Sequence, residues 1–183
     1  MKFTTTSHAL TATSAGAVQA LSGGCAKVSI LASAAMDFNV VPGPEGTLTV
    51  ATVTAAAANV KEKKTITTAG AFGVGDVLRI SVASNNEDYT VTSASSATTA
   101  SEIKDDLLAD TTIAGLVDVT VFGDVITLER KTANTAFTLT ATYQSRQVNH
   151  AIKANERLEL EVPAGASIRA KASSGTLDIS ELE

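Results

Sequence analysis

The chain has 183 residues, of which 31 are alanine and 26 threonine, with a formal net charge of −5 and only 4% aromatic residues. This composition excludes several classes of protein. A net negative chain offers no basic footprint for nucleic acid or anionic lipid, and no run of roughly 20 apolar residues suits a transmembrane helix. Because Cys25 is the single cysteine, no intramolecular disulfide can form.

The beginning of the chain lacks the pattern of a secretory signal. Threonine and serine follow Lys2 where a signal peptide has its apolar segment. We therefore expect a protein that is made and assembled in a cytosol. Cys25, which follows Gly23 and Gly24, is interpreted as a small buried side chain rather than as a catalytic nucleophile.

Small residues dominate residues 1–50, where we expect short strands at residues 26–31 and 38–41. The segment at residues 42–46, Pro-Gly-Pro-Glu-Gly, is typical of a turn or linker. Residues 51–64 are interpreted as a connector, in which Ala55–Ala58 either begin a short helix or are extended. The charges at residues 61–64 are interpreted as a solvated surface.

Alternation of apolar and polar side chains predicts strands at residues 77–82, 88–92, 117–121, 126–129 and 137–142. A helix is predicted near residues 100–109. Thr99 and Glu102 have the spacing of a capping box, and Ile103, Leu107 and Leu108 form an apolar stripe. Residues 65–144 therefore read strand, strand, helix, strand, strand, strand.

Residues 145–183 return to short strands, including residues 158–162, with turns at residues 163–165 and 173–175. Neither terminal flank is long enough to build a core alone. We therefore predict a mainly β fold, in which residues 1–50 and 145–183 form a discontinuous β-sandwich. Residues 65–144 form a small α+β domain with one helix, inserted between the two flanks.

The sequence shows no catalytic equipment. His8 and His150 have no neighbouring cysteine or dense carboxylate cluster, so they are interpreted as surface or turn residues. Residues 85–88, Asn-Asn-Glu-Asp, lack the rest of a calcium loop and are interpreted as a hairpin turn. The glycines at positions 70, 73 and 75 match no phosphate-binding loop and are expected to shape a turn before a strand. Carboxylates on the predicted helix (Glu102, Asp105 and Asp106) are interpreted as solubilising. We expect no catalytic, cofactor-binding or metal-binding residue, and no enzyme activity.

The order of these segments is similar to that of a known module. Gly75 and Asp76 enter a strand, Tyr89 and Thr90 belong to the next one, the helix covers residues 101–109, and strands follow at residues 119–121, 125–129 and 135–140. This pattern resembles a module of bacteriophage virion proteins and some bacterial surface proteins. Residues 25–30 and the closing segments at 155–160 and 174–179 also look like strands of small phage head and tail proteins.

The resemblance implies a phage virion structural protein, most specifically a capsid decoration (cement) protein that binds the outer head surface and stabilises the shell. It implies the major capsid protein and other copies of the chain as partners, as a homotrimer, with no nucleic acid, membrane or cofactor involved. The implied location is the capsid surface, after assembly in the bacterial cytoplasm.

A tail tube, fibre or adaptor protein is the alternative function. A carbohydrate-binding module is a more distant one, because sugar sites usually rely on aromatic platforms and the chain has no Trp and two Tyr. The threonine-rich residues 1–14 are expected either to add a strand to a neighbouring subunit or to fray. The sandwich is expected to lie next to the capsid, with the inserted domain projecting outward.

Overall fold

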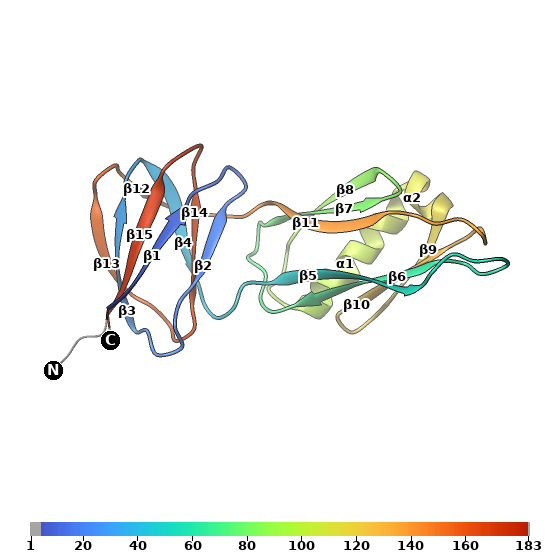
Figure 1. Cartoon of the computed structure of the whole chain (residues 1–183), viewed down its shortest axis with the longest axis horizontal. Coiled ribbons are helices and arrows are strands. Elements are labelled where there is room, and N and C mark those ends of the chain that lie inside the picture. Colours follow the sequence, from blue (N-terminus) through green and yellow to red (C-terminus); the bar gives the residue numbers. More distant parts are fainter. Residues whose placement is uncertain (1–4, 183) are drawn as a thin grey trace. The chain divides into compact units, whose positions relative to one another are not determined.

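The computed structural model describes residues 5–182. Within them, fifteen strands form four antiparallel sheets, accompanied by two helices (Figure 1). The predicted mainly β fold class is confirmed. The chain divides into two compact units. The sandwich unit comprises Met1–Glu45 and Ser145–Glu183, and the inserted unit comprises Gly46–Gln144.

The sandwich unit contains two sheets of four strands. The first has the order β1 (Thr5–Thr11), β15 (Thr176–Leu182), β3 (Lys27–Ala32), β13 (Arg157–Glu161). The second has the order β12 (His150–Ile152), β4 (Met36–Val41), β14 (Ser167–Lys171), β2 (Ala17–Ala20). Both sheets combine strands from the two flanks, so neither flank builds this unit alone. The core lies among buried aliphatic side chains such as Ile30, Ile168 and Ile179, together with Phe38, and it also takes in Cys25.

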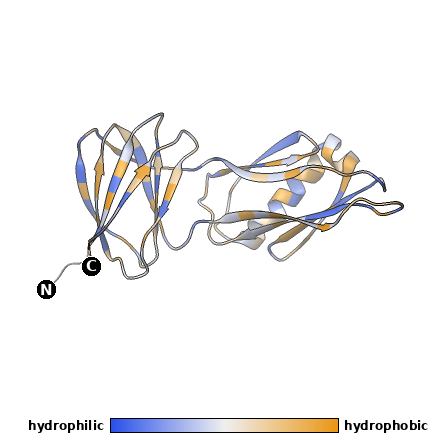
Figure 2. Ribbon diagram, in the orientation of Figure 1, coloured by the Kyte–Doolittle hydropathy of each residue, from blue (hydrophilic) through white to orange (hydrophobic). Residues whose placement is uncertain are grey.

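The inserted unit combines two sheets with the helices. One sheet has the order β5 (Thr47–Thr54), β6 (Lys63–Ala69), β10 (Val125–Arg130), β9 (Val117–Phe122). The other has the order β11 (Leu139–Ser145), β7 (Val77–Val82), β8 (Asn85–Thr90). Helix α1 (Ser96–Ala109) packs against β6, β9, β10 and β8, and α2 (Thr111–Leu116) follows it. Hydrophobic and hydrophilic residues alternate along these strands (Figure 2), and Leu78, Ile80 and Val82 are buried as the alternation predicts.

The prediction of a single helix was wrong, because α2 follows α1 directly. Asp110 is both the C-cap of α1 and the N-cap of α2. Its side chain accepts hydrogen bonds from the backbone N–H groups of Thr112 at 2.7 Å and Ile113 at 3.1 Å. One carboxylate thereby satisfies two of the free N–H groups with which every helix begins, and it starts the second helix.

Helix α1 also begins earlier than predicted. Its N-cap is Ser95, whose side chain accepts a hydrogen bond from the Thr98 N–H, so the capping box of Thr99 and Glu102 does not form. Thr99 is fully buried inside the helix. Ile103 and Leu107 are buried as expected, whereas Leu108 is 43% exposed.

The predicted connector at residues 51–64 is instead part of a hairpin. β5 and β6 pair antiparallel, with Val50 opposite Ile66 and Ala51 opposite Thr65. The charges at residues 61–64 are also not uniformly solvated. Glu62 is 6% exposed, and its side chain accepts a hydrogen bond of 2.6 Å from the Phe137 N–H. The charge run therefore contains a buried carboxylate, Glu62, which is hydrogen-bonded to the segment directly before β11.

Residues 85–88 are not the hairpin turn. The turn lies at Ala83 and Ser84, whose φ angles are 48° and 72°, and β8 begins directly afterwards at Asn85. Two consecutive positive φ angles define the two-residue turn that matches the twist of a hairpin. The loop of Gly70, Gly73 and Gly75 does precede strand β7, as expected.

The expected strand donation by the N-terminus is also corrected. β1 pairs antiparallel with β15 of the same chain, with His8 opposite Ile179 and Leu10 opposite Leu177. Because its backbone is already paired on one side within the sandwich unit, this segment is neither frayed nor free to leave for a neighbour. Residues 1–4 of that expectation lie outside the described residues.

Candidate interaction surface

Residues 5–182 contain no group of three or more His, Cys, Asp or Glu side chains placed to hold a metal ion. The two histidines lie on strands rather than in turns. The ring of His150 packs against Phe38, with ring centroids 5.6 Å apart, and His8 is 2.9 Å from Glu181 through its Nε2 atom. The sequence had suggested no role for either histidine, and the structure gives each one a structural contact.

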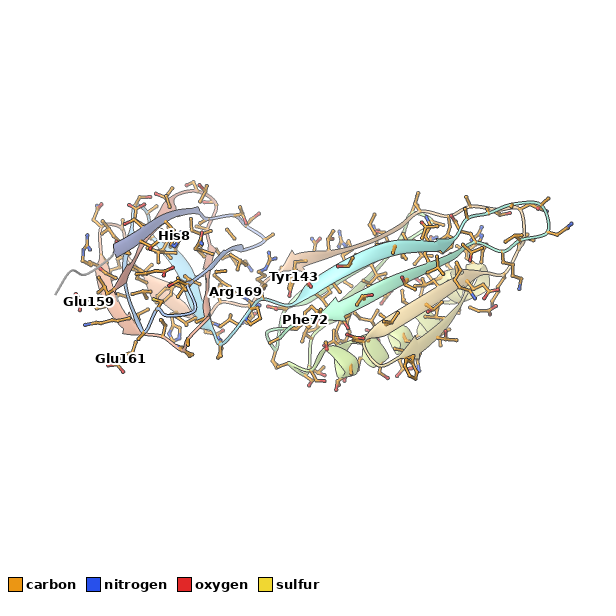
Figure 3. The ribbon with its side chains drawn as sticks, turned by 60° about the horizontal axis from the view of Figure 1, so that its bottom comes forward. His8, Phe72, Tyr143, Glu159, Glu161 and Arg169 are labelled. Carbon is orange, nitrogen blue, oxygen red and sulfur yellow. The ribbon has the colours of Figure 1, made fainter. Side chains whose placement is uncertain are left out.

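Glu181 is a buried carboxylate on β15 of the sandwich unit, with a side chain only 1% exposed. Burial works to raise its pKa, but hydrogen bonds from the Ser22 hydroxyl, the Ser22 backbone N–H and His8 outweigh it, so the pKa of Glu181 lies below its ordinary value. The carboxylate therefore ties the loop before β3 and strand β1 to β15. Figure 3 shows His8 in this unit.

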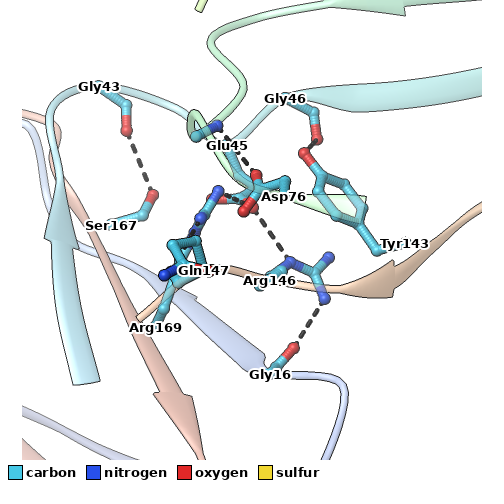
Figure 4. A network of polar contacts seen from close by, with 11 residues as sticks. Gly16, Gly43, Glu45, Gly46, Asp76, Tyr143, Arg146, Gln147, Ser167 and Arg169 are labelled. Carbon is cyan, nitrogen blue, oxygen red and sulfur yellow. Dashed lines mark hydrogen bonds and ion pairs between the residues drawn. The ribbon is translucent and has the colours of Figure 1, made fainter. Parts of the chain in front are cut away.

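Glu45 joins two arginines of the sandwich unit (Figure 4). Arg169 is 1% exposed, and it donates to Glu45 from Nη2 at 2.7 Å and from Nε at 3.1 Å. Arg146 also donates to Glu45, at 3.1 Å, and to the Gly16 carbonyl at 2.7 Å. Glu45 is thus the carboxylate partner of both arginines, which makes the cluster a structural contact of the fold.

The helix carboxylates of the inserted unit are less simple than expected. Glu102 accepts hydrogen bonds from the Tyr89 hydroxyl and from Thr92 Oγ1, and these bonds lower its pKa. Asp106 is partly buried close to Glu102 and Asp105, and this desolvation, followed by the charges of the two neighbours, raises its pKa. The partners of Glu102 come from the chain itself, which makes this a structural contact.

The most unusual surface of the inserted unit is a hairpin segment that we call the arm. It consists of β5 and the turn that follows it, residues 47–60. No charged residue occurs from Gly46 to Val60. Residues 51–61 are exposed except for the half-buried Ala56, and the exposed fraction reaches 59% at Val53. In Figure 1 the turn between β5 and β6 extends past the other strands of this unit.

The arm has a defined conformation despite this exposure. At its base, Leu48 and Val50 pack against the core of the inserted unit. At its tip, the N–H of Val60 donates to the Ala57 carbonyl at 2.9 Å, and Asn59 has a φ of 61°. The backbone N–H of Asn59 donates to the side-chain oxygen of Asn134 at 2.7 Å. The exposed apolar side chains are therefore held in fixed positions.

β5 is also an edge strand, since its outer side pairs with no strand in the described part of the chain. Natural sheets usually protect such edges with charged residues, prolines or bulges. β13, at the edge of a sandwich sheet, contains Arg157, Glu159 and Glu161, and Figure 3 marks the two glutamates. β5 has no charge and no proline over eight residues, with one register shift between Thr52 and Thr54.

Sequence reasoning missed the arm because the four alanines at 55–58 suit a helix, a connector or a turn equally well. The available signal was the uncharged run from Gly46 to Val60, which begins with the strand-like Thr-Leu-Thr-Val pattern. An exposed, uncharged and conformationally fixed segment of this kind is typical of a protein–protein contact.

No protein-family model matches this chain, and neither a curated protein nor a solved structure was found to be significantly similar to it. Between residues 5 and 182, neither helix has the length and apolar character needed to cross a bilayer.

Proposed function

We propose that this chain is a structural protein of a bacteriophage virion, and most specifically a capsid decoration (cement) protein bound to the outer surface of the head. The resemblance of residues 65–142 and of the closing strands to phage virion proteins supports this proposal. The single structural observation that carries it is the arm, because an assembly protein needs an exposed segment that is ready to bind.

The tip of the arm is the segment that contacts the shell. Ala55, Ala57, Ala58 and Val60 present small apolar surface, and the hydrogen bonds around Asn59 fix its shape before binding. A preorganised contact loses little conformational freedom on association. Each contact of this size is weak, but a shell presents many equivalent sites, and further links between neighbouring copies would add avidity.

The arm takes the place of the N-terminus as the contact segment, so this proposal reverses the expected polarity: the inserted unit, which contains the arm, contacts the shell. Residues 5–11 are engaged with β15, so removing them would damage the sandwich unit rather than test binding. The buried and half-buried polar clusters at Glu45, Glu181 and Glu102 are used within the fold. These assignments favour a structural role over catalysis.

The test is binding of the purified protein to heads of the phage that encodes it, prepared without this protein. Ala58→Glu places a charge at the exposed tip, and Ala154→Glu is a matched control at an exposed turn of the sandwich unit. We expect native protein and the control to co-sediment with the heads, and Ala58→Glu to bind at least tenfold more weakly.

Electron cryo-microscopy of the same particles locates the protein. Density on the head surface, with the tip against the shell, supports the proposal. Absence of binding by the native protein, density confined to the tail, or equal binding of Ala58→Glu and the control would overturn it.

A further inference from the structure

We infer that the β5 strands of two copies of this chain pair with each other, antiparallel, about a twofold axis. The inference deepens the proposed function. It rests on that function in one respect, which is that the arm is a contact segment. It assigns the edge of β5 to a second copy and leaves the tip for the shell.

The backbone of β5 provides the first argument. An edge strand has unpaired N–H and C=O groups along its outer side, and the groups that satisfy them best belong to another extended strand. β5 is eight residues long, one of the longest paired strands, and its residues from Ala51 to Thr54 are exposed. Its threonine and valine side chains favour cross-strand pairing.

Charge favours a second copy as the occupant. Two copies of a chain with a net charge of −5 repel each other, so they approach most easily along a surface without charge. β5 has none, and its neighbour β6 has Lys63 paired with Glu129 at 3.0 Å. Identical strands therefore meet no like charges across the axis.

Two other edge strands differ from β5 in carrying charged residues. β13 has Arg157, Glu159 and Glu161, and β8 has Glu87 and Asp88. When such a strand pairs with itself, carboxylates come opposite or diagonal to carboxylates, which destabilises the pair. β1 and β11 are uncharged as well, but His8 of β1 is bonded to Glu181, and β11 carries the bulky Tyr143 in contact with Phe72.

The side-chain alternation of β5 limits the possible registers of the pair. Leu48 and Val50 face the core, so Thr49 and Ala51 lie on the opposite face of the sheet. Residues that lie directly opposite each other in an antiparallel pair are on the same face of the sheet. A twofold axis perpendicular to the sheet therefore passes between two copies of the same residue and not between two peptide bonds. Ala51 is central, small and exposed, and with Ala51 on the axis Val50 of one copy lies opposite Thr52 of the other.

The pair joins two four-stranded sheets into one of eight strands. It differs from the homotrimer that the resemblance implies, because a closed ring of three requires β5 to meet a different edge of the next copy. The mass of the assembly therefore separates the two arrangements.

The test uses the purified full-length protein alone, without phage heads. In an Ala51→Cys variant, residues 51 of the two copies lie opposite each other, and we expect mild oxidation to yield a disulfide-linked dimer. Cys25 is 1% exposed and does not compete. Ala154→Cys, at an exposed turn of the sandwich unit, is the control and should yield at least tenfold less dimer at the same concentration.

A second variant tests the non-covalent pair. Ala51→Lys places like charges on the axis, and we expect its dimer to dissociate at least tenfold more readily in sedimentation equilibrium, while its circular dichroism spectrum stays that of the native fold. A native protein that is monomeric at every concentration, a native trimer, or Ala51→Cys crosslinking no better than the control would overturn the inference. If the protein is monomeric but binds the shell, the proposed function stands without the dimer. If it forms the β5-linked dimer but does not bind phage heads, the proposed function is overturned and the dimer stands.

Discussion

The backbone N–H of Asn59 donates a hydrogen bond of 2.7 Å to the side-chain oxygen of Asn134, and the backbone N–H of Asn134 donates to the Val60 carbonyl at 3.2 Å. Both asparagines have a φ of 61°, a conformation that asparagine tolerates better than most residues. These two bonds join the tip of the arm to the loop before β11 and set the shape of the exposed turn.

Asn134→Gly removes the side-chain acceptor and still allows the positive φ angle. We expect faster amide hydrogen exchange at Asn59 and Val60, with a loss of about 1 kcal/mol in the free energy of unfolding. The matched control is Asn155→Gly, which changes an asparagine of φ 60° in the sandwich unit. If exchange at the tip is the same in both variants, Asn134 does not hold the arm.

Gly46 is a position without room for a side chain. A Cβ atom there would lie 2.7 Å from the Phe72 ring, and that ring is buried and stacked on Tyr143. We expect Gly46→Ala to lower the free energy of unfolding by about 1–3 kcal/mol, measured by urea titration.

Gly115→Ala is the matched control for this overpacking. Gly115 lies in α2, where no atom approaches within 4 Å of an added Cβ, so the substitution should be neutral or stabilise by about 0.5 kcal/mol. Equal effects of the two substitutions would contradict the predicted clash at Phe72.

Glu45 is expected to stabilise the sandwich unit strongly. Its removal in Glu45→Ala leaves Arg169, which is 1% exposed, without its two charge-assisted hydrogen bonds. The loss of two charge-assisted hydrogen bonds from a buried guanidinium is expected to cost about 2–3 kcal/mol, which urea unfolding would detect. Glu161→Ala on the exposed strand β13 should change stability by less than about 0.5 kcal/mol. A loss for Glu45→Ala no larger than that of the control would show that the ion cluster is not stabilising.

The lowered pKa of Glu181 predicts that the free energy of unfolding decreases at acid pH. Its pKa in the folded chain is lower than its ordinary value of 4.5, because the hydrogen bonds from Ser22 and His8 outweigh the effect of burial. A carboxyl group with a lowered pKa stabilises the fold above pH 4.5, and this contribution is lost as the pH falls from there through the folded-state pKa.

The measurement is urea unfolding at several pH values between neutral and about 3 for the native protein and Glu181→Gln. We expect the variant to be less stable at neutral pH and to lose less stability on acidification. Parallel curves for the two proteins would mean that Glu181 does not contribute to the acid dependence, and Glu161→Gln serves as the control.

Local alternation allowed most strands of the inserted unit to be predicted. Leu78, Ile80 and Val82 are buried on one face because the period of a strand is two. Helix α1 was also predictable from Ile103 and Leu107. Its start was predicted wrongly because Thr99 and Glu102 have the spacing of a capping box. In the structure Glu102 instead accepts hydrogen bonds from Tyr89 and Thr92, which precede the helix.

The exposure of the arm and the pairing in the buried ion cluster could not be predicted for a related reason. Glu45 and Arg169 are 124 residues apart, and no local pattern shows that a charge at one position meets a charge at the other. The exposure of Ala51 and Val53 depends on where the sheet ends, which is a property of the assembled strand order rather than of the segment.

The ends of the inserted unit lie close together. Its first residue, Gly46, accepts a 3.0 Å hydrogen bond from the Tyr143 hydroxyl near its last one, and in the sandwich unit Glu45 accepts a 3.1 Å bond from Arg146. A short loop could therefore connect residue 45 of the sandwich unit to residue 145. An inserted foreign domain would likewise need no long linker at this point. A scaffold with this property is suited to display, in which another folded domain replaces residues 46–144.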